Sequence, residues 1–119
     1  MPNSTSRADL QFAENALRAL VEHLQAGPLK DDSLAIAAVG DLEVRIAAAQ
    51  ALLDWAEHSP AAAIEARLAA AEAAQRGSEL HLEWSGRALL RPNAEGRTVP
   101  LAHLRRSLGD HYLNGAALD

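Results

Sequence analysis

The sequence contains no cysteine and few of the residues that favour β-strands. Its 119 residues include 27 Ala and 19 Leu, whereas Val, Ile, Phe, Trp and Tyr together number 11. Ala and Leu lead the scale of helix propensity, while β-branched and aromatic residues are enriched in strands. The composition therefore excludes an all-β fold and predicts an all-α domain. The lack of cysteine also excludes disulfides, thiolate metal sites and cysteine nucleophiles.

Long apolar runs are missing as well. The longest is the six residues Leu34–Val39, whereas a helix that crosses a bilayer needs about 20. Residues 1–7 are polar and lack the apolar centre of a signal peptide. These features predict a soluble cytoplasmic protein that makes no membrane contact.

Positive charge is scarce in most of the chain. Residues 1–86 carry 6 basic and 13 acidic side chains, and residues 87–119 carry 5 basic and 3 acidic ones. A general nucleic-acid-binding domain is normally basic, so we expect no nucleic-acid partner. The basic C-terminal segment is either a solvated surface or a contact for an anionic ligand or an acidic partner.

Helix-breaking residues divide the chain into four helical segments, at about residues 6–26, 33–58, 60–85 and 100–114, with a loop over residues 87–99. Ser6 with Asp9 forms a capping-box pattern, which predicts the first helix start. Ser59-Pro60 combines a favoured N-cap with a favoured first helical residue. Because this link is so short, it predicts antiparallel neighbours. The expected fold is a single domain over residues 1–119, an antiparallel four-helix bundle.

Apolar spacing predicts which side of each helix faces the core. For the third segment, the expected inward residues are Ile64, Leu68, Ala71, Gln75, Ser78 and Leu82. For the last segment, they are Leu101, Leu104, Leu108 and Tyr112. Gly77 lies inside the third segment, where it is either an exposed weak point or a place where another helix approaches closely.

The sequence shows no pattern typical of a catalytic or metal centre. No acidic residue is followed by His three positions later, no two His are four apart, and no Gly-rich phosphate loop is present. We therefore expect no metal and no cofactor, and assign no catalytic residue. Arg can bind carboxylate or phosphate through two parallel hydrogen bonds, and two His share one side of the last segment. The candidates for a ligand or partner contact are Arg87, Arg91, Arg97, His103 and His111.

Several ordered motifs resemble one known domain. They are Gly40-Asp41-Leu42 in the second helical segment, Glu79-Leu80 with Glu83 in an Ala-rich helix, and Tyr112-Leu113-Asn114-Gly115 at the end. Over about residues 8–115 the chain is similar to the C-terminal helical domain of acyl-CoA-dehydrogenase-fold flavoproteins. The branch that it resembles comprises the flavin-dependent monooxygenases of sulfur acquisition and thiophene desulfurisation. This resemblance implies a four-helix bundle of the kind that forms the core of tetramers.

The sequence departs from that family where flavin is held. It contains neither the N-terminal helical domain nor the β-barrel domain, Leu24–Pro28 lacks the family's basic residues, and Val99 stands where the family has Asp before Pro100. The resemblance therefore implies a bundle that binds neither FMN nor FAD by itself.

Three functions are compatible with these features. The first is a non-catalytic bundle subunit, in a homo-oligomer or in a heteromer with an acyl-CoA-dehydrogenase-like flavoprotein. The second is a small cofactor-independent enzyme or ligand-binding protein that reuses the bundle cleft. The third is a relic without an activity of its own.

Overall fold

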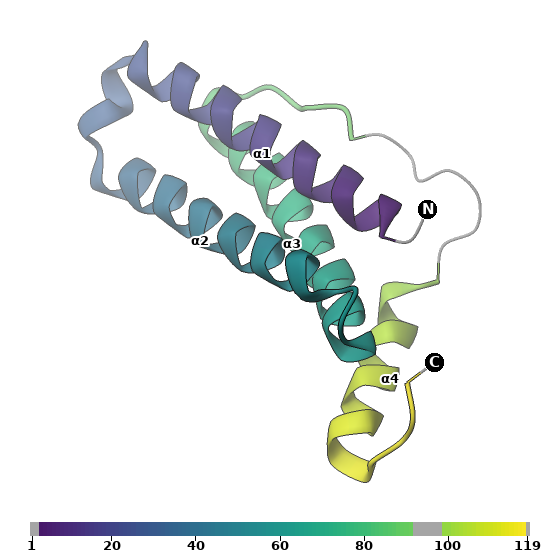
Figure 1. Cartoon of the computed structure of the whole chain (residues 1–119). Helices are drawn as coiled ribbons and strands as arrows, with labels where there is room; N and C mark the ends of the chain where they lie inside the picture. Colours follow the sequence, from purple (N-terminus) through teal and green to yellow (C-terminus); the bar gives the residue numbers. More distant parts are fainter. Residues whose placement is uncertain (1–2, 92–98, 119) are drawn as a thin grey trace.

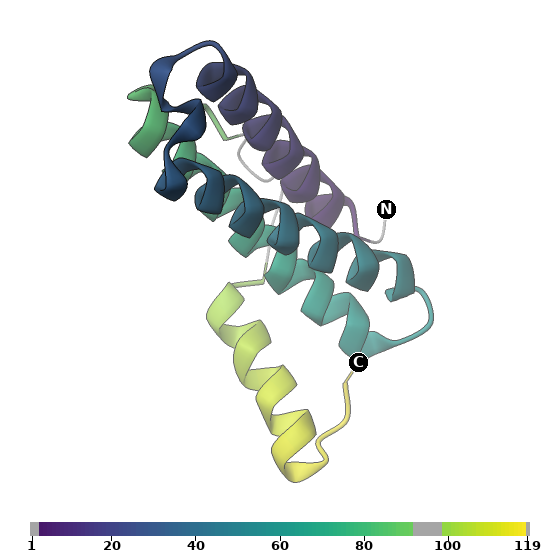
Figure 2. The same ribbon diagram turned by 90° about the vertical axis from the view of Figure 1, so that its left-hand side faces the viewer.

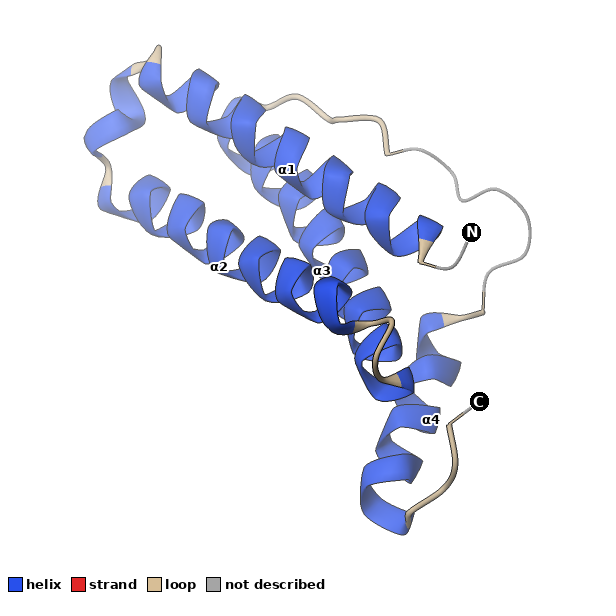
Figure 3. Ribbon diagram, in the orientation of Figure 1, coloured by secondary structure: helices blue, strands red, loops and turns tan. Residues whose placement is uncertain are grey.

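The computed structural model describes residues 3–91 and 99–118, and these residues form four α-helices (Figure 1). They are α1 (Ser4–Gln25), α2 (Ser33–Trp55), α3 (Pro60–Ser85) and α4 (Leu101–Asn114). A short 3-10 helix that the sequence analysis did not predict, η1 (Pro28–Asp31), links α1 to α2. The described ranges contain no strand (Figure 3). The all-α prediction with four helices is confirmed.

Helices α1, α2 and α3 form the core of the molecule. Each of the three packs against the other two, and α4 packs against α3 alone. Figures 1 and 2 show α4 leaving the three long helices at an angle and extending past one end of them. No residue of α4 is buried. The fourth helix therefore lies outside a three-helix core, and the predicted inward residue Tyr112 is 67% exposed.

The predicted inward face of α3 is confirmed only in part. Leu68 and Ala71 are buried, but Leu82 is 51% exposed and Gln75 is exposed. Leu80, which the spacing does not place inward, is 1% exposed. The physical reason is the central position of α3, which contacts α1, α2 and α4 and so buries more than one side. Its buried side chains are mostly alanine methyl groups, namely those of Ala62, Ala66, Ala70, Ala71, Ala73 and Ala74.

Gly77 marks a close approach between α3 and α1. A Cβ atom at this position would lie 3.0 Å from the Cβ of Ala16, which is tighter than ordinary van der Waals contact. The second of the two interpretations of Gly77 is therefore confirmed.

The predicted starts of α2 and α3 are confirmed, but α2 ends at Trp55 rather than at residue 58, and the predicted start of α1 is wrong. Asp32 Oδ1 accepts hydrogen bonds from two backbone N–H groups of α2, and Ser59 Oγ accepts one from Ala62. By contrast, α1 begins at Ser4, and Ser6 is buried inside the helix. The capping-box prediction for Ser6 and Asp9 is wrong, because Asp9 forms tertiary ion pairs instead.

Candidate functional site

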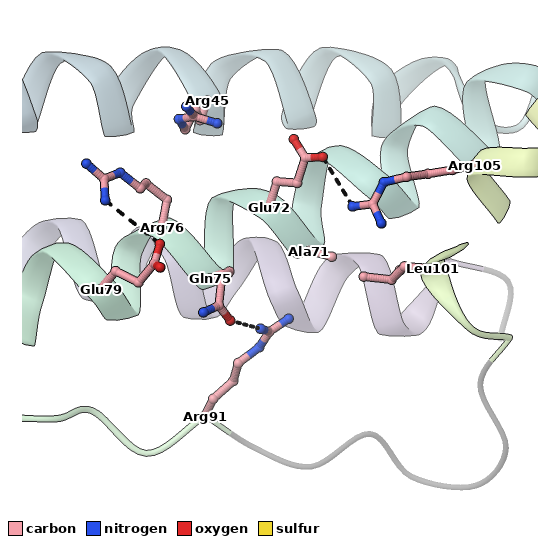
Figure 4. Close-up of a pocket in the computed structure, with 9 residues that line it drawn as sticks. All are labelled: Arg45, Ala71, Glu72, Gln75, Arg76, Glu79, Arg91, Leu101 and Arg105. Carbon is pink, nitrogen blue, oxygen red and sulfur yellow. Dashed lines mark hydrogen bonds and ion pairs between the residues drawn. The ribbon is translucent and has the colours of Figure 1, made fainter. Parts of the chain in front are cut away.

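An open groove of about 390 Å³ lies where α2, α3, the segment at residue 91 and α4 meet. Figure 4 shows its lining, which is rich in charged side chains. The lining residues are Arg45, Ala71, Glu72, Gln75, Arg76, Glu79, Arg91, Leu101 and Arg105. Four arginines in one groove make it the strongest candidate for binding an anionic group.

Each of these arginines already has an acidic partner. Arg45 pairs with Asp41 of its own helix at 3.1 Å, and Arg76 lies 3.8 Å from Glu79. Arg105 of α4 reaches Glu72 of α3 at 3.4 Å. An anionic ligand would therefore have to compete with existing ion pairs, and these three are formed by partly exposed side chains.

Arg91 has the most buried of these partners. Its guanidinium lies 2.9 Å from one carboxylate oxygen of Asp9 in α1, and that of Arg67 in α3 lies 3.0 Å from the other. The Asp9 side chain is only 12% exposed. Arg91 also reaches the Gln75 side chain at 3.5 Å. This three-residue cluster, the Asp9 clamp, fixes the segment that follows α3 onto α1 and α3.

The other predicted site residues do not gather in the groove. Arg87 is exposed, and its carbonyl oxygen accepts a 2.7 Å hydrogen bond from His81 Nδ1. His103 is exposed beside Arg106, and His111 Nδ1 donates to the carbonyl oxygen of Ala116 beyond the end of α4. Arg97 lies outside the described residues. Of the five candidates, Arg91 alone is placed by the structure in the groove lining.

Sequence reasoning missed the other members of the groove. The spacing of four residues predicts that Arg45 pairs with Asp41 and Arg76 with Glu72 on solvated helix faces. The Asp41 pair is confirmed, but Glu72 pairs with Arg105, 33 residues later, and Arg76 lies 3.8 Å from Glu79. A signal was present in the concentration of arginine in residues 87–119, which needed acidic partners from the acidic first part of the chain.

Tyr112 provides a second link between α4 and α3. Its hydroxyl donates a 3.2 Å hydrogen bond to Glu65 Oε1. The negative charge of Glu65, this hydrogen bond and a smaller desolvation effect raise the pKa of Tyr112 above its ordinary value of 10.0. The link is therefore present below pH 10 and is lost as the pH rises through the raised pKa.

Tyr112 is the single tyrosine of the chain, so its ionisation can be followed by phenolate absorbance in the near ultraviolet. We expect a titration midpoint above the ordinary value, and a return toward that value in Glu65→Gln. A Glu79→Gln variant, changed elsewhere on α3, serves as the control and should leave the midpoint unchanged. Equal midpoints in wild type and Glu65→Gln would contradict the contact between α4 and α3.

A second candidate surface is the outer side of α2. This helix is apolar on nearly all sides, and its buried residues include Leu42, Ile46 and Leu53. The opposite side exposes Leu34 by 72% and Val44 by 68%. In Figure 2 α2 lies in front of α3, and none of the drawn helices crosses its outer side.

The two tryptophans have different surroundings. Trp84 of α3 is partly buried against the core. Trp55 at the end of α2 is 59% exposed, and its ring lies 4.8 Å from that of His58.

No protein-family model, curated protein or solved structure matches the chain. Within residues 3–91 and 99–118, no three His, Asp or Glu side chains gather as a metal site would require. In the same part of the chain no helix is both long and apolar enough to cross a membrane.

Proposed function

We propose that this chain is a non-catalytic helical-bundle subunit that assembles through the outer side of α2. The observation that carries the proposal is the exposure of large apolar side chains along that side, with Leu34, Val44 and Trp55 each more than half exposed. Exposed apolar surface of this kind marks interaction sites when it is contiguous. Burying it would add to a core that consists largely of small side chains.

The resemblance to the C-terminal domain of acyl-CoA-dehydrogenase-fold flavoproteins supports the same proposal. Bundles of that family form the core of tetramers, so a related chain would retain a surface for packing against other helices. The partner is then either a further copy of this chain or a related flavoprotein.

A ligand-binding role is the second candidate, and the groove favours it. Arg76 has the longest of the four arginine ion pairs, at 3.8 Å. Its guanidinium is therefore the one most readily transferred to a carboxylate or phosphate ligand. This role would leave the outer side of α2 unused, which distinguishes it from the first proposal.

The assembly proposal is tested by Val44→Glu. A charge at this exposed position should leave the fold intact but place a carboxylate in the proposed contact, so we expect association to weaken at least tenfold, about 1.4 kcal/mol. The matched control is Leu90→Glu, an equivalent change at a residue that is 97% exposed and lies after α3. Light scattering coupled to size exclusion measures self-association, and affinity capture on the purified chain measures binding of a flavoprotein partner.

Two results would overturn the assembly proposal. One is a wild-type chain that stays monomeric and captures no partner. The other is association that Val44→Glu and Leu90→Glu weaken equally.

A further inference from the structure

The exposed side of α2 has the regular spacing of a helix-pairing surface. Residues on it recur at alternating intervals of three and four, the repeat that keeps one seam of a helix facing a partner helix. The apolar members, here called the α2 stripe, are Leu34, Ala37, Val44, Ala48, Ala51 and Trp55. All of them are exposed, and they lie opposite the side of α2 that packs in the core.

One charged residue, Asp41, occupies the remaining position in this spacing. Its carboxylate pairs with Arg45 of the same helix at 3.1 Å, and the two side chains are 49% and 43% exposed. A helix that docks on the α2 stripe meets this ion pair, so a cation near Asp41 and an anion near Arg45 would favour its binding.

A second copy of α2 in the antiparallel direction meets both requirements. A twofold axis at the level of residue 43 brings Asp41 level with the partner's Arg45, and Arg45 level with the partner's Asp41. The four side chains then alternate in charge along one edge of the contact. In a parallel pair, equivalent residues are level, so the two Asp41 carboxylates would meet within the apolar stripe.

The same register matches the apolar residues. With a rise of about 1.5 Å per residue, Ala37 lies within about 1.5 Å of the level of the partner's Ala48. Small side chains thus face small side chains, which allows the two helices to approach closely. Glu43, on the other edge, lies level with its own copy. Repulsion between the two Glu43 carboxylates limits the affinity.

We propose that the α2 stripe is the contact of an antiparallel homodimer, with the twofold axis level with residue 43. This inference rests on the proposed function and names its partner as a second copy of the chain. One face of a 23-residue helix is smaller than the roughly 800 Å² per partner of a standard interface. The dimer is therefore weak and in exchange with the monomer.

The lack of native cysteine makes disulfide cross-linking a direct test. A disulfide requires Cα atoms about 4.4–6.8 Å apart. Val44→Cys lies next to the axis and should cross-link to its own copy under mild oxidation. Along the helix axis, Ala37→Cys lies about 18 Å from its own copy and Ala48→Cys about 15 Å. Each variant alone should therefore stay monomeric. In a mixture, the two variants should cross-link to each other. Leu90→Cys is the control for random collision.

The possible outcomes distinguish a failure of the homodimer from a failure of the proposed assembly function. If Ala37→Cys and Ala48→Cys each link to their own copies, and their mixture gives no link between the two variants, a parallel dimer replaces the antiparallel one. No link above the Leu90→Cys level at any α2 position would overturn the homodimer. If Val44→Glu then still abolishes capture of a flavoprotein partner, the proposed function survives with a different occupant. If it changes no association at all, both fail.

Discussion

Replacing Leu80 with alanine is expected to lower the free energy of unfolding by about 3 kcal/mol, because truncating a fully buried leucine removes apolar contacts and leaves a cavity. The Leu80 side chain is 1% exposed and lies in the core shared by α1, α2 and α3. For a domain of this size such a loss lowers the melting temperature by roughly 12 °C. Thermal and urea unfolding followed by circular dichroism measure it.

The matched control is Leu82→Ala on the same helix. Leu82 is 51% exposed, and surface substitutions of this type change stability by about 0.5 kcal/mol or less. The sequence analysis predicts the opposite order, with Leu82 inward. A larger loss for Leu82→Ala than for Leu80→Ala would therefore restore the sequence-based face of α3 and contradict the packing described above.

The error in α3 has an identifiable cause. Sequence periodicity locates a single apolar side, but α3 has neighbours on several sides and fills them with alanine. Alanine is also common on exposed sides such as that of α2, so it gives little contrast between core and surface. In α2, larger residues mark one side, and Leu42, Ile46 and Leu53 on that side are all buried.

Local sequence signals predict helix ends better than they predict tertiary contacts. The N-caps Asp32 and Ser59 depend on bonds to residues two or three positions away, so they can be recognised in the sequence. The partner of Arg91 is Asp9, 82 residues earlier, and no local pattern connects the two. Asp9 was instead assigned to a cap because it follows Ser6 by three residues.

The composition of the sequence predicts the groove only in part. The excess of arginine after residue 86 indicated an anionic partner, and the structure supplies such partners from the chain itself, as in Arg105 with Glu72 and Arg91 with Asp9. Which arginines gather in the groove depends on where α4 crosses α3. That crossing includes polar contacts between residues far apart in the sequence, such as Tyr112 with Glu65, and the helix pattern alone does not specify them.

The Asp9 clamp leads to the second large effect, because Asp9→Ala removes the shared partner of two arginines at once. Breaking a buried ion pair costs about 3–5 kcal/mol, but Arg67 and Arg91 are 19% and 32% exposed, so solvent screening reduces the loss. We expect unfolding to become easier by about 2 kcal/mol, or roughly 8 °C in melting temperature.

Glu79→Ala is the control, since it removes an exposed pair with Arg76 at 3.8 Å and should cost less than about 0.5 kcal/mol. Arg91→Ala alone should cost about 1 kcal/mol, because the carboxylate keeps Arg67. The double variant Asp9→Ala/Arg91→Ala should lose less stability than the sum of the losses of the two single variants, as expected for residues in contact. Urea unfolding of the four variants completes the cycle. Additive losses, or an Asp9→Ala loss no larger than that of Glu79→Ala, would show that Asp9 does not hold Arg91, and would leave Arg91 available to an anionic ligand in the groove.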